Sequence, residues 1–387
     1  MIPRRNLLRN LRKAFAEPGY AGRVFSKRLK SFLTYRLSEG ASAFPETISL
    51  FLTYRCNLRC RMCGQWGEAG SSRGYTADML KDQLSLADME TLVDGLSSFK
   101  PNITLFGGEP MLYKDWERVV RFIKARGMRC NMITNGILLE ANAEMLIEAG
   151  IDEIIFSLDG PREIHDEIRG ASGTYDRAMA GFKKLARLKK ERGMRSPLVN
   201  ISSTIFEINY KRLAEVVRSA EEMNASSVTF HHLIFTGRDI YAEHDRLFKD
   251  NFSCSSVDWN GFTRDTLPDI DAGILLDVIR EIKSLKTPLD LSFYPNLTDE
   301  EVRRYYTHFD FLPDSYKRRC LSPWMVAYIF PDGSVRPCQS LNYAFGNIKG
   351  SSFERIWNCG RATEYRKVLK RDGYFPVCPR CTEFYRY

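Results

Sequence analysis

The chain has 387 residues, of which 44% are hydrophobic and 27% are charged. These values are typical of a globular protein with one large or two smaller domains, and they exclude a disordered chain, a collagen-like repeat and a coiled coil. No stretch reaches the roughly 18 consecutive apolar residues of a membrane-spanning helix, and the basic start of the chain lacks the apolar core and cleavage site of a secretory signal. We therefore expect a cytoplasmic protein.

The first 36 residues carry the excess positive charge. Ten Lys and Arg side chains stand there against one acid, Glu17, and the rest of the chain is balanced at zero. Apolar residues recur at helical spacing in two stripes, Leu7–Phe15 and Phe25–Leu33, on either side of a Pro-Gly pair. Residues 1–45 are thus predicted to form a basic helical arm, either docked on the body or attached to an anionic membrane surface or an acidic partner. Nucleic-acid binding is not expected, because the body has no net positive charge.

From residue 47, short apolar strands alternate with amphipathic helices. The predicted strands are Thr47–Thr53, Asn102–Phe106, Arg129–Ile133, Glu153–Leu158, Val199–Ile205 and Ser227–Ile234. The predicted helices are Leu86–Phe99, Asp115–Arg126, Ala141–Ala149, Tyr175–Glu191 and Tyr210–Met223. This alternation predicts an α/β core over residues 46–240 with a parallel sheet and right-handed crossovers, in the form of a partial (β/α)6 barrel of the TIM type. Functional residues of such folds gather at the C-terminal ends of the strands.

The remainder of the chain is predicted as two further segments. Residues 241–319 are a connecting region without an assignable motif, and its stretch Phe248–Thr266 is rich in Asn, Ser and Asp, which suggests a loop that acts as a lid. Residues 320–387 contain short strands, turns and cysteines, and are expected to form a small cysteine-rich α+β domain.

Ten cysteines are present, and in a large cytosolic chain clustered cysteines are more typical of metal ligands than of disulfides. Directly after the first predicted strand stand Cys56, Cys60 and Cys63, with the spacing Cys-x3-Cys-x2-Cys. Three thiolates on one loop can bind three irons of a [4Fe–4S] cluster and leave the fourth iron open, whereas a structural zinc site needs four closed ligands.

The second predicted strand ends at Gly107-Gly108-Glu109-Pro110. With the three cysteines before it, this segment resembles the GGEP motif of the radical S-adenosylmethionine (SAM) superfamily, and the resemblance extends over roughly residues 47–235. It implies that Glu109 accepts hydrogen bonds from the methionyl ammonium of SAM and that the two glycines allow a close backbone approach.

Weaker matches to the same superfamily follow in the expected order. Asn135 lies in a Thr-Asn-Gly turn after the third strand, and Ser157 and Asp159 lie in a Ser-Leu-Asp-Gly-Pro segment after the fourth. The resemblance implies that Ser157 and Asp159 face the ribose hydroxyls of SAM, and that Arg169 pairs with its carboxylate. Each segment is also compatible with a simple turn, and Arg169 with a surface ion pair.

A second cysteine group begins at Cys320, continues to Cys338 in a Gly-x4-Cys pattern and ends at Cys378 and Cys381. It resembles the SPASM/twitch extension of radical SAM enzymes in its shortened, single-cluster form, which implies a second, fully ligated [4Fe–4S] cluster. A structural zinc ribbon is the alternative for these four ligands. Cys254, in the predicted lid, is the candidate for a catalytic acid or radical quencher.

The resemblance implies reductive cleavage of SAM to a 5′-deoxyadenosyl radical, which abstracts a hydrogen atom from a substrate, with a flavodoxin or ferredoxin as reductant. An auxiliary cluster suggests oxidation, so we expect dehydrogenation of a sugar, a polyol or a lipid-linked small molecule. One alternative is a peptide-maturing enzyme that forms thioether or carbon–carbon crosslinks. An alternative of another class is a non-catalytic electron-transfer or scaffold protein.

Overall fold

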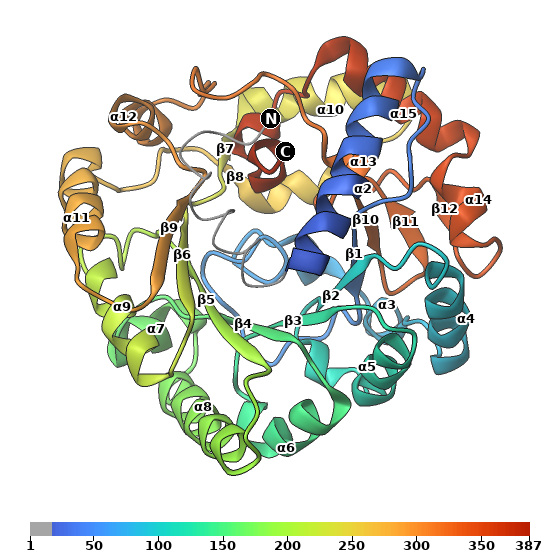
Figure 1. Ribbon diagram of the computed structural model, residues 1–387. Coiled ribbons are helices and arrows are strands. Elements are labelled where there is room, and N and C mark those ends of the chain that lie inside the picture. Colours follow the sequence, from blue (N-terminus) through green and yellow to red (C-terminus); the bar gives the residue numbers. More distant parts are fainter. Residues whose placement is uncertain (1–17) are drawn as a thin grey trace.

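The computed structural model describes residues 18–387, so the first apolar stripe of the basic arm lies outside the described residues. The chain forms a ten-stranded sheet with the strand order β12-β11-β10-β1-β2-β3-β4-β5-β6-β9. Eight neighbouring strands, from β10 to β9, pair in parallel, and β11 and β12 add an antiparallel edge. Figure 1 shows the sheet as an open arc with helices on its convex side, which confirms the predicted partial barrel.

All six predicted strands are present and differ from the prediction only at their ends. They are β1 (Thr47–Phe51), β2 (Asn102–Phe106), β3 (Cys130–Thr134), β4 (Glu153–Ser157), β5 (Leu198–Thr204) and β6 (Ser227–His231). All five residues of β1 are buried, because this strand lies between β2 and β10 in the middle of the sheet. The cysteine loop that follows β1 therefore leaves the sheet at its centre.

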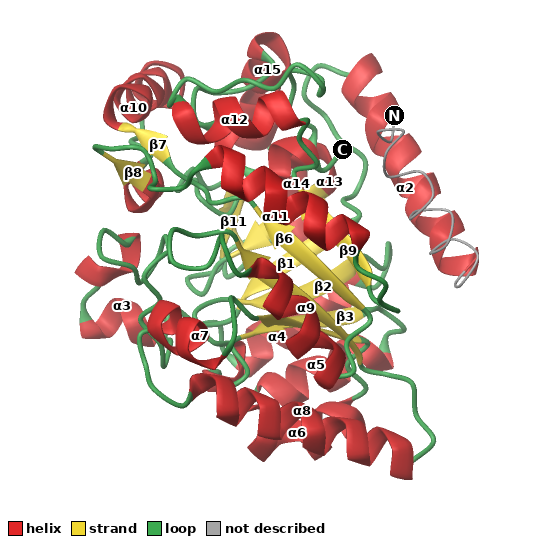
Figure 2. Cartoon of the chain, turned by 90° about the vertical axis from the view of Figure 1, so that its left-hand side faces the viewer, coloured by secondary structure: helices red, strands yellow, loops and turns green. Residues whose placement is uncertain are grey.

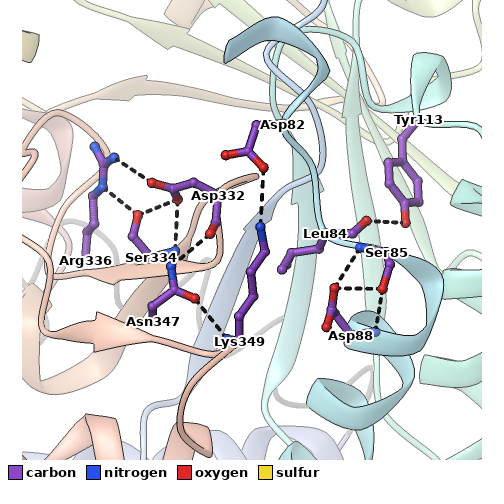
Figure 3. Close-up of polar contacts among 10 residues, drawn as sticks. All are labelled: Asp82, Leu84, Ser85, Asp88, Tyr113, Asp332, Ser334, Arg336, Asn347 and Lys349. Carbon is purple, nitrogen blue, oxygen red and sulfur yellow. Dashed lines mark hydrogen bonds and ion pairs between the residues drawn. The ribbon is translucent and has the colours of Figure 1, made fainter. Parts of the chain in front are cut away.

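The helices that cover the barrel also match the predictions closely. They are α4 (Leu86–Leu96), α5 (Trp116–Ala125), α6 (Leu139–Ala149), α8 (Thr174–Glu191) and α9 (Leu213–Glu222). The short helices α3 (Ala77–Lys81) and α7 (Arg162–Arg169) lie at the C-terminal end of the strands (Figure 2). At the start of α4, Ser85 and Asp88 form a capping box in which each side chain accepts a hydrogen bond from the other residue's backbone N–H, which fixes the helix start (Figure 3).

The connecting region is more regular than predicted. It contains most of α10 (Arg238–Phe252), the 3₁₀ helix η4 (Val257–Phe262), α11 (Ala272–Ser284), β9 (Asp290–Tyr294) and α12 (Asp299–Thr307). Its strand β8 (Thr263–Arg264) pairs with β7 (Thr236–Gly237), which lies just before the region, in a two-stranded sheet. Strand β9 pairs in parallel with β6 and adds a seventh strand to the predicted six. The predicted loop Phe248–Thr266 begins inside α10 and contains η4 and β8, so only residues 253–256 and 265–266 of it are irregular.

The C-terminal segment extends the barrel sheet. Strand β10 (Val326–Ile329) pairs with β1, and β11 (Ser334–Arg336) and β12 (Gly346–Asn347) continue outward. Helices α13 (Ser322–Met325), α14 (Phe353–Trp357) and α15 (Gly360–Asp372) and the 3₁₀ helices η5 (Cys378–Arg380) and η6 (Thr382–Tyr385) complete it. Because β10 and β1 are hydrogen-bonded, the second cysteine group is attached directly to the strand that carries the first.

Helix α2 (Pro18–Leu37) packs on this C-terminal segment. The ring of Tyr35 meets Trp324 edge to face with centroids 5.0 Å apart, and Arg28 forms an ion pair with Glu46 at 2.6 Å. In residues 18–387, no helix has the length and apolar character needed to cross a bilayer.

Candidate active site

The loop that carries Cys56, Cys60 and Cys63 is held in place by the motif after β2. The N–H of Gly108 donates to Thr53 O at 2.8 Å, and the N–H of Glu109 donates to Arg55 O at 2.9 Å. A Cβ atom at Gly108 would lie 2.1 Å from Arg55 O, so only glycine allows this approach. The two motifs recognised in the sequence are thus one physical unit.

Helix α7 holds the same loop from the other side. The N–H of Arg61 donates to Ile168 O at 2.9 Å, and Arg61 pairs with Glu167 at 2.6 Å. At the end of α7, a guanidinium nitrogen of Arg169 lies 3.7 Å from Cys60 Sγ. The C-terminal turn of α7 therefore fixes the position of the central cysteine.

The three thiols fit an iron–sulfur cluster in their chemistry. Burial raises the pKa of Cys56 to about 11 and raises that of Cys60, and the neighbouring thiols raise both further. Metal binding requires the thiolates, so loading releases protons at neutral pH, and the positive charge of the irons offsets the cost of burying the thiolates.

Glu109 is fully buried, and its carboxylate is already oriented. It accepts hydrogen bonds from the Thr134 hydroxyl at 2.9 Å and from the N–H of Asn135 at 2.9 Å. Burial raises its pKa to about 7, and these hydrogen bonds oppose the rise. Asn135 also reaches the cysteine loop, because its amide lies 3.9 Å from Cys56 Sγ and donates to Asn57. Both oxygens of Glu109 are thus engaged within the protein, and its predicted contact with the ammonium group of SAM remains a prediction. Pro110 begins a 3₁₀ helix, η3 (Pro110–Leu112), and Gly107 precedes it with a positive φ of 149°.

Asp159 and Arg169 have a different arrangement from the predicted one. Asp159 is fully buried, with one carboxylate oxygen paired with Arg169 and the other accepting from the N–H of Thr204 at 2.9 Å. Both oxygens are engaged inside the protein, so these contacts give no support to a ribose-binding role for Asp159. Arg169 likewise faces Asp159 and Cys60. Ser157 is half-buried as the last residue of β4, and its predicted contact with SAM remains a prediction.

The second cysteine group is brought together from three separate parts of the chain. Cys320 precedes α13, Cys338 follows β11, Cys378 begins η5 and Cys381 follows it. The charges of Cys320, Cys378 and Cys381 all act on Cys338, and burial raises the pKa of each of the four thiols, to about 12 for Cys378. Each thiolate of a [4Fe–4S] cube bonds its own iron, so its ligands need not converge on one point. Between residues 18 and 387, no set of three or more His, Cys, Asp or Glu side chains does converge on one point.

Two adjoining cavities lie between the cysteine groups. The first has a volume of about 250 Å³ and reaches Cys63, whereas the second has a volume of about 90 Å³ and reaches Cys338, Cys378 and Cys381. Their linings share four residues, namely Ile234, Phe262, Gln339 and Ser340. A molecule in the first cavity would therefore have one cluster site at one end and the other beyond a shared wall.

Residues 253–262, which we term the cap, contribute Asp258 and Phe262 to the lining of the first cavity. Gly261 packs against the backbone of Gly64, the residue after Cys63, so that a Cβ at Gly261 would lie 2.1 Å from Gly64 O. The base of the cap is tied to α10, because His244 hydrogen-bonds Ser256 at 2.9 Å and Asp245 accepts from the N–H of Ser256. Part of the loop Phe248–Thr266 thus packs against the cysteine loop and α10, and its action as a lid remains a prediction.

The Gly261→Ala variant is expected to be less stable than the wild type by about 1–3 kcal/mol, because its methyl group collides with backbone that cannot move independently of the cysteine loop. Urea denaturation would measure this loss, and iron analysis should show lower occupancy of the first site. Gly74→Ala is the matched control, since no atom lies within 4 Å of the added Cβ. Equal stability of the two variants would contradict the proposed contact.

Cys254 is not among the described residues that line either cavity. Helix α10 ends at Phe252, and Ser253 adopts a left-handed conformation that turns the chain. The charges that act on Cys254 come from Arg361 and Asp245 rather than from a cluster site. The structure gives no support for the predicted catalytic role of this thiol.

Comparison with known proteins decides the family. Residues 50–220 match the radical SAM superfamily, and residues 320–382 match the SPASM iron–sulfur cluster-binding domain. The chain belongs to the radical SAM superfamily. The cofactors of this radical SAM enzyme are SAM and iron–sulfur clusters, which settles the zinc-ribbon alternative in favour of iron–sulfur and sets aside a non-catalytic scaffold.

The curated relatives of the chain are named for different activities. It is 25% identical to an AdoMet-dependent heme synthase of Oleidesulfovibrio alaskensis over 89% of this chain and 82% of that protein. It is 28% identical to the Fe-coproporphyrin III synthase of Methanosarcina barkeri over 79% and 72%. The sporulation killing factor maturation protein SkfB of Bacillus subtilis is 23% identical over 85% and 68%.

Solved structures share the fold of this radical SAM enzyme. Streptococcus suis SuiB aligns with a TM-score of 0.59 at 14% identity, over 89% of this chain and 73% of that one. The enzyme anSMEcpe with bound AdoMet aligns with a TM-score of 0.53 at 17% identity, over 88% and 91%.

Some residues at the site of this radical SAM enzyme were not predicted. Thr134 orients Glu109, Ile168 positions the cysteine loop through its carbonyl, and Asp258 lines the first cavity. Thr134 could have been found from the sequence, because it is a polar residue at the end of a predicted strand, where functional residues gather. Asp258 had none, because it lies in a segment without periodicity that reaches the site only through tertiary packing.

Proposed function

We propose that this radical SAM enzyme dehydrogenates a small hydroxylated molecule, such as a sugar or a polyol, bound in the first cavity. The observation that carries the proposal is the position of this cavity, which touches Cys63 and shares a wall with the cavity that reaches three cysteines of the second group. Removal of one hydrogen atom leaves a substrate that must lose one more electron and a proton. A second cluster site across a shared wall is suited to accept that electron.

The lining of the cavity disfavours a negatively charged substrate. Its polar residues are mainly amides and hydroxyls, namely Gln65, Gln339, Ser71, Ser72 and Ser340, and no Lys, Arg or His is among the described residues that line it. A coproporphyrin carries four carboxylates, which proteins bind with basic side chains. The lining therefore favours a sugar or polyol over the porphyrin after which one relative is named.

Peptide maturation is the alternative function. Similarity to the maturation protein of Bacillus subtilis, and the fold shared with a SuiB that was crystallised with its precursor peptide, favour it. A 250 Å³ cavity has room for one side chain of such a peptide. A peptide substrate would have to enter past the cap, which packs on the cysteine loop at Gly64.

In this proposal, the residues of the chain position SAM and the cysteine loop and enclose the cavity. Glu109 is oriented to receive the ammonium group of SAM, Arg169 fixes Cys60, and the cap excludes water from the cavity. When bound, SAM and the reduced cluster supply a one-electron cleavage and the acceptor for the substrate hydrogen atom, with a flavodoxin or ferredoxin as the proposed electron donor.

A double substitution, Cys378→Ala/Cys381→Ala, tests whether the first cluster site serves SAM cleavage and the second accepts the substrate electron. After anaerobic reconstitution, the wild type should hold about eight irons per chain and the variant about four. We expect the variant to keep releasing 5′-deoxyadenosine in the presence of dithionite but to form no oxidised product from a sugar or polyol substrate.

Cys359→Ala is the control, because this thiol lies in the same segment and hydrogen-bonds Phe345 O at 3.2 Å, outside both cavities. Oxidised product at the wild-type rate from the double variant would contradict the proposed electron acceptor. A product that is cross-linked rather than oxidised would favour peptide maturation.

We propose separately that α2 rests on an anionic membrane surface. Four apolar side chains are exposed along it at intervals of four residues, namely Phe25, Leu29, Leu33 and Leu37. Arg23, Lys30 and Arg36 are exposed beside them, and the helix contains no acid. Figure 2 places α2 on the opposite edge of the molecule from β7 and β8, so this contact would not by itself bring a lipid-linked substrate to the cap.

Sedimentation with vesicles tests the proposed surface. The wild type should bind phosphatidylcholine vesicles that contain phosphatidylglycerol, and Phe25→Asp/Leu29→Asp should reduce binding by roughly tenfold or more. Met194→Asp, which changes an exposed apolar residue elsewhere, is the control. Equal sedimentation of all three proteins would disprove membrane contact through α2.

A further inference from the structure

Asp258 is the one acid among the described residues that line the first cavity. It belongs to η4 within the cap, and its side chain is 14% exposed. A carboxylate so far from bulk water needs partners, and it defines what kind of group the cavity can hold.

The partner of Asp258 is Arg336, whose guanidinium lies 3.2 Å from one carboxylate oxygen. Arg336 has further contacts of its own, since it donates to the Ser334 hydroxyl at 3.0 Å and lies 3.8 Å from Asp332 (Figure 3). Its guanidinium also stacks over the Phe330 ring at 3.9 Å. Two acids therefore share one arginine, so the charge of Asp258 is only partly neutralised.

The second carboxylate oxygen of Asp258 makes no hydrogen bond within the part of the chain that the structure describes. Aromatic rings surround the space it borders, with Tyr54 and Tyr75 in edge-to-face contact at 5.0 Å and Phe51 stacked on Phe330 at 5.2 Å. The Asp258 charge acts on Tyr75, whose pKa is raised mainly by burial and also by this neighbour. An unengaged acceptor beside aromatic faces suits a ring that carries hydroxyl or amino donors.

We propose that Asp258 is the specificity-determining residue of the cavity and anchors the substrate by accepting a hydrogen bond from a hydroxyl or an ammonium group. This inference rests on the proposed function and narrows its substrate class to donor-bearing sugars or amino sugars. Substrates whose corresponding group is a carboxylate are repelled, because two negative charges would meet in a cavity with no free cation among its described lining residues.

Calorimetric titration of the reconstituted, SAM-loaded enzyme with three related probes tests this role. Glucose and glucosamine should bind at millimolar concentration, and glucuronate should not. Asp258→Asn should weaken the binding of both probes, by at least about tenfold for glucosamine, whose charge-assisted hydrogen bond is lost. A larger loss for glucosamine than for glucose identifies an ammonium partner, whereas equal losses identify a hydroxyl.

Asp265→Asn is the matched control, because Asp265 is an exposed acid close to the cap that pairs with Arg238. Since Asp258→Asn leaves Arg336 with one acid fewer, the double variant Asp258→Asn/Arg336→Gln, which replaces the pair by two amides, serves if the single variant does not fold. Wild-type affinity for glucosamine in either variant, tight binding of glucuronate, or no binding of glucose and glucosamine by the wild type would overturn the inference. The iron count and 5′-deoxyadenosine release of the wild type do not depend on the sugar probes. They therefore test the proposed function separately from the role of Asp258.

Discussion

Replacing Cys60 by alanine is expected to abolish the release of 5′-deoxyadenosine and to lower the iron content from about eight to about four per chain. Cys60 is the central thiol of the loop after β1, and Arg169 and the end of α7 hold it in place. With two thiolates left, the first cluster loses one of its three protein ligands, and SAM loses the iron that it binds. Anaerobic reconstitution followed by iron and sulfide analysis, with the nucleoside measured by chromatography, provides the readout.

The matched control is again Cys359→Ala, which should keep both the iron content and nucleoside release of the wild type. The Cys60 and Cys378/Cys381 variants should differ sharply, since only the former is expected to lose SAM cleavage. Continued release of 5′-deoxyadenosine from Cys60→Ala would show that SAM is cleaved without the loop after β1, and the assignment of the first site would be wrong.

Asp159→Asn is expected to destabilise the protein by about 3–5 kcal/mol, which is the usual cost of removing one partner of a buried ion pair. Asp159 is fully buried and Arg169 is nearly so, and among the described residues no other carboxylate pairs with Arg169. Urea denaturation of the metal-free protein would measure the change. We also expect poorer iron loading of the first site, because Arg169 links α7 to Cys60.

Asp176→Asn is the matched control, because it makes the same substitution in an exposed ion pair. Asp176 pairs with Arg162 on the surface, where such a pair contributes at most about 1 kcal/mol to the free energy of unfolding. Replacing both buried partners in Asp159→Leu/Arg169→Met should cost less than the sum of the single substitutions, because no buried charge is then left unpaired. If Asp159→Asn and Asp176→Asn lost equal stability, the buried pair would not be what holds α7 against the cysteine loop.

The sequence was sufficient for the six central strands and for the two loops that meet above them. Strand β1 (Thr47–Phe51) is buried throughout, and β2 to β6 carry buried, mostly apolar residues largely at alternate positions, so their burial follows from a local pattern. The cysteine loop and the Gly107–Pro110 motif each occupy a few consecutive residues, so their spacing could be recognised without knowing any long-range contact.

The edges of the sheet could not be predicted in the same way. Strand β9 (Asp290–Tyr294) has only one buried residue out of five, so it lacks the apolar run that identifies a buried strand. Strand β10 (Val326–Ile329) is apolar, but its pairing with β1 joins residues almost 280 positions apart. This pairing unites the C-terminal segment with the barrel, and no local pattern encodes it.

The family chemistry could be inferred from residue type and short spacing alone, since the cysteines and the Gly107–Pro110 turn are local motifs. The pairing of Asp159 with Arg169, the place of Cys254 away from the cavities and that of Asp258 in the lining of one of them became known only from the fold. The role of a polar side chain depends on its partner, and each of these partners is brought near by packing between segments distant in the chain.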